Sequence, residues 1–248
     1  MPSKTLIAVV NCHSRENWAN ALRETWKPLV QGADVLFFRG QPWQVHIPAQ
    51  PDVVQLNCDD SYAGLPEKVR AIMRWAHDHG YEHVLKCDDD VVLNPAELLS
   101  SGFEKHRYSG KLNRRGIPAV PFGFNYWLDR QCMEIISKAE LPIDNDDEKW
   151  VAETLYKQGI DLVDVPRYAL HYGTLIDRSQ ENYAYRPLNK KAKEYEAPGI
   201  FSWAIFLTSH GDSNVSSGEK IAEFHRVFVS KVGSKVTKSI ELAKPSLL

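Results

Sequence analysis

Short apolar runs alternate with amphipathic stretches along the first 170 residues. Four short, largely apolar runs, typical of buried strands, lie at 6–10, 35–38, 53–56 and 84–87. One helix is predicted from Arg15 to Trp26, with Ser14 as its cap and Pro28 after it. A second helix has Pro66 in its first turn and ends before Gly80. This alternation predicts an α/β domain with a twisted, mostly parallel central sheet flanked by helices.

The later part of the chain continues the pattern less regularly. Further elements are expected in this order: a helix from Asn94 to about Phe103, an exposed polar and basic loop at 104–116, a strand around Val120, a helix at 129–139, a helix capped by Asn145 and ending at Gly159, a strand at 160–165, and an edge strand at 200–207. The last 34 residues form a mildly basic segment without a clear pattern. We therefore expect a core at 1–175 and an extension of unknown fold at 176–248, packed on that core.

Composition narrows the class of protein. The 248 residues are 43% hydrophobic and 25% charged, with a net charge of −2, which excludes a disordered chain and an overtly basic nucleic-acid binder. No apolar run is long enough for a membrane helix, and the first ten residues lack a signal-peptide pattern, so a cytoplasmic protein is expected. The four cysteines form no C-x-x-C pair, which favours free thiols over a zinc site.

Three consecutive carboxylates, Asp88, Asp89 and Asp90, follow directly on the strand at 84–87. Three adjacent like charges require a compensating cation or full solvation. Ligands of open α/β sheets bind at the carboxyl ends of strands, and alternate residues of an extended chain point the same way. Asp88 and Asp90 therefore predict a site for Mg²⁺ or Mn²⁺, ions that in turn bind phosphate oxygens. The alternative is an acidic turn.

Several segments resemble one enzyme family. Residues 60–65 read D-S-Y-A-G-L, a helix with Lys68 and Trp75 follows, and residues 85–91 read L-K-C-D-D-D-V. Upstream, residues 21–26 read A-L-R-E-T-W, and downstream G-F-N-Y-W-L at 123–128 and D-E-K-W-V-A at 147–152 complete the series. In order and spacing, these segments resemble the β-1,3-galactosyltransferase and fringe group of glycosyltransferases. The resemblance covers roughly residues 5–173.

The resemblance implies a fold, a reaction and a cofactor. The fold is the nucleotide-diphosphosugar (GT-A type) domain, which makes 1–175 the catalytic core. The reaction is an inverting transfer of a sugar from a UDP-sugar to an acceptor hydroxyl, with Mn²⁺ or Mg²⁺ as cofactor. The ion stabilises the charge that develops on the leaving UDP.

The resemblance also assigns roles to residues. Asp90 is the direct metal ligand, and Asp88 and Asp89 contact metal-bound water, ribose or sugar. An inverting transfer needs one acceptor-side carboxylate as base; Glu148 matches that position, and Asp147 or Asp146 serves if the helix starts differently. A third metal ligand is expected at His171, with His210 as the second choice. Arg23 and Asp60 are expected nucleotide contacts, and Arg15, one helical turn before the position of the family's phosphate-binding Arg, is expected to substitute for it.

Departures from the family pattern qualify these expectations. The family's base is an Asp where this chain has Glu148, and its phosphate-binding Arg falls at Trp18 or Ala19 here. Gly64 replaces an Asn. The family's usual membrane anchor and disulfides have no counterpart in this sequence, which predicts a bacterial or viral cytoplasmic relative.

The sequence is also compatible with other functions. The basic residues of 105–115 and the basic tail are compatible with a polyanionic acceptor, such as a hydroxylated base in DNA glycosylated by a viral enzyme. The same carboxylates are compatible with a metal-dependent phosphohydrolase or nucleotidyltransferase, although 10–14 contains no glycine for a phosphate loop. A sugar-binding module without catalysis is the third alternative.

Overall fold

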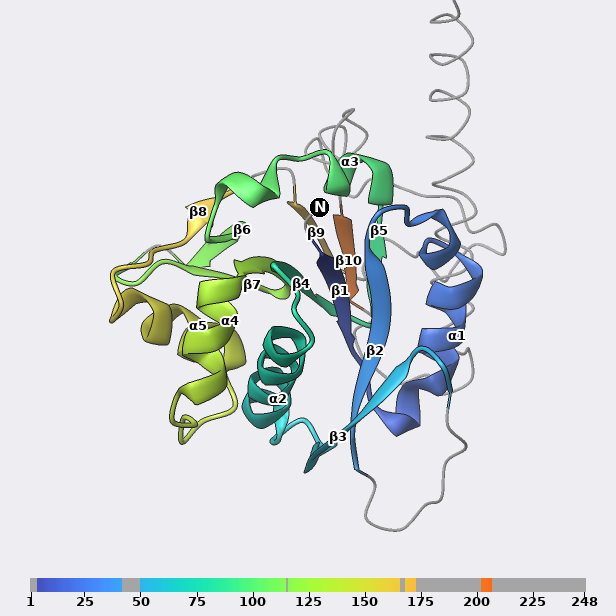
Figure 1. The fold of residues 1–248 in the computed structure, drawn as a ribbon, viewed down its shortest axis with the longest axis horizontal. Helices are drawn as coiled ribbons and strands as arrows, with labels where there is room; N and C mark the ends of the chain where they lie inside the picture. The colour runs from blue at the N-terminus through green and yellow to red at the C-terminus, as the bar shows by residue number, and fades with distance from the viewer. Residues whose placement is uncertain (1–3, 42–49, 115, 166–167, 173–201, 207–248) are drawn as a thin grey trace, which may run out of the picture.

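The computed structural model describes residues 4–41, 50–114, 116–165, 168–172 and 202–206. Within these ranges the chain forms a seven-stranded sheet and a three-stranded sheet (Figure 1). The larger sheet has the order β3-β2-β1-β4-β7-β6-β8. Its strands are β1 (Thr5–Val10), β2 (Asp34–Gln41), β3 (Val53–Asp59), β4 (His83–Asp88), β6 (Tyr108–Arg114), β7 (Val120–Asp129) and β8 (Val163–Asp164).

Parallel pairing dominates the larger sheet. The strands β3, β2, β1 and β4 are mutually parallel, whereas β7 runs antiparallel to both β4 and β6. The smaller sheet has the order β5-β10-β9, from β5 (Val91–Leu93), β9 (Tyr168–Tyr172) and β10 (Ser202–Phe206). A mixed, mostly parallel sheet is what the alternation of apolar runs predicts.

Helices cover both faces of the larger sheet, as Figure 1 shows with α1 on one side and α2, α4 and α5 on the other. Their bounds are α1 (Glu16–Glu24), α2 (Leu65–Asp78), α3 (Pro95–Leu99), α4 (Arg130–Lys138) and α5 (Asp147–Tyr156). Alternate residues of β1 divide between two apolar cores. Ile7 and Val9 pack with α1, whereas Leu6 and Ala8 pack with α2, α4 and α5.

The expectation of an exposed loop at 104–116 is wrong. After a short 3₁₀ turn (Phe103–Lys105), residues Tyr108–Arg114 form β6, paired with β7 on one side and β8 on the other. Tyr108, Ser109 and Gly110 are buried, while the basic end of the strand is exposed. Pairing with β7, the next strand of the chain, and with the more remote β8 supplies the backbone hydrogen bonds here, so a polar composition did not prevent strand formation.

Two predicted helix caps are displaced. Ser14 lies inside a 3₁₀ turn (His13–Arg15), its hydroxyl 3.2 Å from the Cys12 thiol, and α1 begins at Glu16. The cap of α5 is Asp146 rather than Asn145, because the Asp146 carboxylate accepts the Lys149 amide. The cap of α4 falls at Asp129, as the predicted start of that helix implies.

Other boundaries are shorter than expected. The helix α3 ends at Leu99, before Gly102 takes a left-handed conformation, and the strand expected at 160–165 is the two-residue β8. The strand expected at the edge, β10, lies between β5 and β9. This pairing joins part of the predicted extension to the core; most of 176–248 lies outside the described residues.

Two further features can be compared with the sequence: the state of the cysteines and the length of the helices. Cys12, Cys58, Cys87 and Cys132 are free thiols, and the last three are buried. Among the described residues, the helices are all too short or too polar to cross a bilayer.

Candidate active site

The acidic triplet lies at the carboxyl end of β4, beside the carboxyl end of β1. Val10 of β1 pairs with Asp88 of β4, so Asn11 and the turn after β1 adjoin the triplet. The apolar residues of β4 are buried, which fixes the strand that carries the acids. This is the edge at which open α/β sheets bind ligands.

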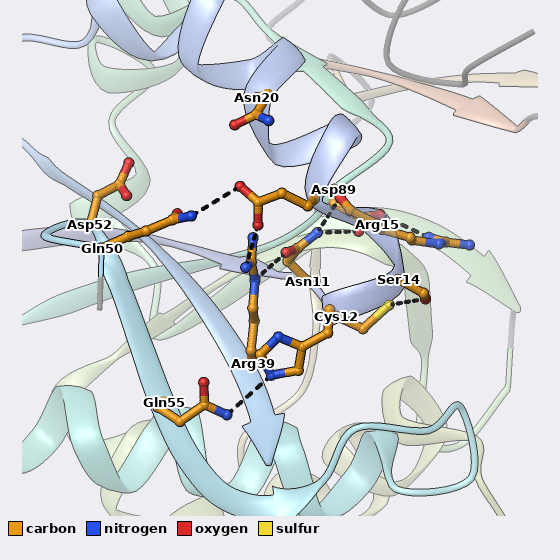
Figure 2. A network of polar contacts seen from close by, with 12 residues as sticks. Asn11, Cys12, Ser14, Arg15, Asn20, Arg39, Gln50, Asp52, Gln55 and Asp89 are labelled. Atoms are coloured by element: carbon orange, nitrogen blue, oxygen red, sulfur yellow. Dashed lines mark hydrogen bonds and ion pairs between the residues drawn. The ribbon is translucent and has the colours of Figure 1, made fainter. Parts of the chain in front are cut away.

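Asp89 belongs to a buried polar network (Figure 2). Its carboxylate accepts a 2.7 Å hydrogen bond from Asn11 Nδ2 and a 2.8 Å bond from Arg15 Nη1. Asn11 Oδ1 in turn accepts a 2.6 Å bond from Arg39 Nε. Burial raises the pKa of Asp89, and Arg15 and Asn11 oppose that shift. Arg15 is the predicted nucleotide contact that the structure brings to the triplet, with its side chain 46% exposed.

Asp90 is half-buried, and its buried Oδ1 atom has no hydrogen-bond partner among the described residues. Burial, followed by the charges of Asp88 and Asp89, raises the pKa of Asp90 well above its usual range. An unpartnered carboxylate oxygen in a low-dielectric site is costly unless a proton or cation satisfies it. This orphaned oxygen, in a donor set of hard carboxylates, fits a divalent cation such as Mg²⁺ or Mn²⁺.

A buried lysine connects the triplet to the second acidic segment. Lys86 Nζ donates to Asp88 Oδ1 at 2.6 Å and to the carbonyl of Gly123, and it lies 3.8 Å from Asp147 Oδ2. Burial together with the charges of Glu148 and Asp88 raises the pKa of Asp147 to about 7, although Lys86 acts against this shift. The structure therefore brings Asp88 of β4 and the first turn of α5 together, as the proposed site requires.

Glu148 lies beside Asp147 in the first turn of α5 and is half-buried. Its carboxylate packs against Gly123 in β7: a Cβ added to that glycine would lie 2.9 Å from Glu148 Oε2. The absent side chain of Gly123 thus provides the space that the longer Glu side chain occupies.

Two predicted nucleotide contacts have their polar atoms engaged elsewhere. Asp60 accepts hydrogen bonds from Lys68 Nζ, the His13 amide and the Gly40 amide, all within 2.8 Å. Arg23 donates to Asp52, Glu16, Gln50 and Asn20 and reaches Asp89 only through intervening side chains. Both are therefore built into the scaffold, and their contact with a nucleotide stays a prediction.

His171 lies in β9, where its backbone pairs with Ile205 of β10, and the preceding Ala204 pairs with Val91. Two strand spacings of about 4.8 Å therefore separate the backbone of His171 from the end of the triplet. The second choice, His210, lies outside the described residues. For His171 only the backbone is described. Among the described residues, no cluster of three or more His, Cys, Asp or Glu is arranged to hold a metal.

Sequence reasoning gave no role to three residues that shape the site. Arg39 is buried in the Asn11 network, Lys86 bridges two carboxylates, and Gly123 accommodates Glu148. The signal for Lys86 was present, since a lysine inside a buried strand must find a counter-charge. Arg39 gave the same signal at the end of an apolar run, without indicating its partner.

Sequence comparison relates the chain to galactosyltransferases. Residues 19–114 match the Galactosyltransferase family model. The chain is 29% identical over 154 residues to dog beta-1,3-galactosyltransferase 4, covering 54% of this chain and 40% of that protein. The human protein of the same name is 32% identical over 118 residues, covering 40% of this chain and 31% of that protein. The chain thus spans less than half the length of these relatives.

Structure comparison supports the fold. The chain is similar to the crystal structure of a glycosyltransferase involved in the glycosylation of the major capsid of PBCV-1, with a TM-score of 0.51 and 14% identity. The match covers 88% of this chain and 98% of that one. The expected α/β fold is thereby confirmed: this chain has the fold of a glycosyltransferase and a sequence similar to galactosyltransferases over its N-terminal half.

Proposed function

We propose that this protein is a metal-dependent glycosyltransferase that moves a sugar from a UDP-sugar to an acceptor hydroxyl with inversion at the anomeric carbon. The observation that carries the proposal is the meeting of two carboxylate groups at Lys86. Asp88 comes from the end of β4 and Asp147 from the first turn of α5, and one ammonium lies within 4 Å of both. A displacement needs one group at the leaving phosphate and another at the attacking hydroxyl.

The donor side is the triplet edge. Asp90, with its unpartnered oxygen, and Asp88 would hold Mn²⁺ or Mg²⁺, with His171 as the further ligand that the strand order supports. When bound, the ion offsets the negative charge that develops on the diphosphate. Arg15, anchored on Asp89 and half exposed, is placed to donate to a phosphate oxygen.

The acceptor side is the first turn of α5. Glu148 is half-buried against Gly123 and takes the proton from the acceptor hydroxyl as the oxygen attacks the sugar. Attack from the face opposite the leaving UDP inverts the anomeric centre. Asp147 is buried and lies 3.8 Å from Lys86, so its carboxylate is less open to an acceptor than that of Glu148, and we assign it as a partner of the base.

The names of the relatives suggest which sugars and which acceptors to test. The matched relatives are named for galactose transfer, and a mouse relative, 30% identical over 86 residues, is named for N-acetylglucosamine transfer. A glycan is the first acceptor class to test. Hydroxylated DNA stays a prediction that rests on basic residues of 105–115, of which Arg114 forms an ion pair with Asp146 beside α5.

The testing experiment is a panel of UDP-sugars incubated with Mn²⁺ and two acceptor sets, simple glycosides and duplex DNA containing hydroxymethylated bases. Released UDP and glycosylated product are both measured. We expect metal-dependent UDP release with one donor, and product with one acceptor set. The proposal would be overturned if the folded protein fails to bind UDP and yields no UDP release and no product with any donor.

A further inference from the structure

Lys86 is a buried cation in a strand whose other central residues are apolar. Its side chain is 1% exposed, and it faces Tyr126 across the β4–β7 pair, with Nζ 5.7 Å from the ring centre. A lysine in such a place is stable only when counter-charges and acceptors surround it. Asp88 and the Gly123 carbonyl supply hydrogen bonds, and Asp147 supplies a second negative charge.

These three partners lie on the two sides of the proposed reaction. Asp88 belongs to the triplet, on the donor side. Gly123 is the residue against which the Glu148 carboxylate packs, and Asp147 directly precedes Glu148 in α5. One ammonium group therefore contacts the donor-side carboxylate, the backbone that supports the base, and the neighbour of the base.

We infer that Lys86 is a positioning residue that sets the distance between the donor-side carboxylates and the base Glu148. This inference rests on the proposed function and adds a specific residue to it. Lys86 does not touch the reacting atoms; it holds Gly123 and Asp147 relative to Asp88. Reactions between positioned groups are sensitive to such distances, since a displacement of about 1 Å lowers rates roughly 100-fold.

The test begins with Lys86→Met, which keeps the length of the side chain and removes its charge. At saturating donor and acceptor, kcat for transfer is expected to fall about 100-fold. The double variant Lys86→Met/Glu148→Gln is expected to be no slower than Glu148→Gln alone, because the group that Lys86 positions is already disabled. A wild-type kcat in folded Lys86→Met, or losses that multiply in the double variant, would overturn the inference.

A second measurement needs no activity. Amide hydrogen exchange is followed in the first turn of α5, where the Lys149 amide is bonded to Asp146. Lys86→Met is expected to accelerate this exchange. Lys68→Met is the matched control, because Lys68 is also buried and paired with one carboxylate, Asp60, and one backbone carbonyl. Equal acceleration in both variants, or none in Lys86→Met, counts against positioning.

A third variant covers the possibility that Lys86→Met does not fold. Lys86→Met/Asp147→Asn removes the cation together with its buried counter-charge, and such paired replacements are tolerated better than single ones. Folded protein with metal-dependent UDP binding but roughly 100-fold slower transfer supports positioning; unimpaired transfer refutes it. Wild-type protein that shows no transfer would refute the proposed function, while the exchange measurement would still decide the role of Lys86.

Discussion

Two clusters of charged side chains lie on opposite sides of the central sheet and look alike in composition. The Arg23 cluster contains Arg23, Lys27, Glu16, Asp52 and Gln50; the Lys86 cluster contains Lys86, Asp88, Asp147, Glu148 and Gly123. Each combines cations with carboxylates beside a strand. They differ in how completely the oxygens of their carboxylates are paired.

In the Arg23 cluster, both oxygens of Asp52 accept bonds from Arg23, and both oxygens of Glu16 have cationic partners. In the Lys86 cluster, Asp147 Oδ2 has no hydrogen bond, and the nearby Asp90 Oδ1 has no partner among the described residues. A completed network stabilises a fold, whereas an incomplete buried one leaves capacity for a ligand. The comparison therefore separates a scaffold from a site, although the sequence offered Asp90 as a metal ligand and Arg23 as a nucleotide contact.

The largest expected effect is the loss of transfer rate when the base, Glu148, is replaced. Glu148→Gln is expected to lower kcat for transfer about 1,000-fold, within the range of general-base catalysis, and to leave UDP affinity unchanged. Steady-state rates and UDP titrations measure both. Asp147→Asn is the companion variant, and its kcat for transfer should fall less than that of Glu148→Gln. If Glu148→Gln retains full transfer, the base is elsewhere and the Lys86 cluster loses its acceptor-side role.

A smaller effect is expected from crowding the base. Gly123→Ala places a Cβ about where the Glu148 carboxylate lies, so the flexible end of that side chain must move. We expect a fall in kcat of about 10-fold without a matching loss of thermal stability, since only the reacting geometry changes. Gly116→Ala is the control, because its added Cβ makes only an ordinary 3.5 Å contact with Pro118. Equal kinetics for both variants would show that Glu148 is not held against Gly123.

Arg23 of the Arg23 cluster is next compared with Arg15, which pairs with Asp89 of the acidic triplet. Arg15→Met is expected to weaken UDP binding about 10-fold, the loss of one charge-assisted hydrogen bond to phosphate. Arg23→Met is expected to lower the melting temperature instead and to leave UDP affinity unchanged in the folded protein. Calorimetric titration and thermal melts give the two values. A loss of UDP affinity in Arg23→Met alone would reverse the assignment of scaffold and site.

The smallest expected effects are on the free energy of unfolding, which Asp52 and Asp147 change in opposite directions as the pH rises. Burial acts to raise the pKa of Asp52, but Arg23 and Lys27 outweigh it and lower the pKa to about 2. Its stabilising contribution is present above about pH 4 and is lost as the pH falls through about 2. The raised pKa of Asp147 means that the folded state holds this proton more tightly than the unfolded chain. Stability therefore falls as the pH rises from about 4 to about 7.

Urea unfolding of the wild type, Asp52→Asn and Asp147→Asn across pH 2 to 8 measures both trends. The advantage of wild type over Asp52→Asn should vanish on acidification. Relative to Asp147→Asn, wild type should weaken on going from acid to neutral pH. Parallel curves for all three proteins would mean that neither carboxylate has a shifted pKa.

The sequence predicted the features that depend on local pattern. The apolar run at 6–10 and the largely apolar run at 84–87 are central strands because such runs are stable only when covered on both faces. The triplet was singled out because three adjacent acids after such a strand need a cation or water to offset their charges. The closeness of Asp88 and Asp147 was expected only through the family resemblance, since no local pattern joins residues so far apart in the chain.

The features that were missed depend on contacts between distant segments. The segment at 108–114 is polar, and it becomes β6 only because β7 and β8 lie beside it. Lys86 was part of a matched motif, but its partners Gly123 and Asp147 come from elements remote in sequence. The nucleotide contact of Arg23 stays a prediction, but its bonds to Asp52 and Gln50, just before β3, had no signal in the local sequence.

The most direct measurement of the central claim is a calorimetric titration of UDP with Mn²⁺ present and with EDTA added. We expect saturable UDP binding with Mn²⁺ that is lost with EDTA and in Asp90→Ala. The control Asp78→Ala, which removes an exposed carboxylate of α2, should bind as wild type does. Equal UDP affinity with and without the metal, or in Asp90→Ala, would contradict the assignment of the triplet edge as a metal-dependent nucleotide site.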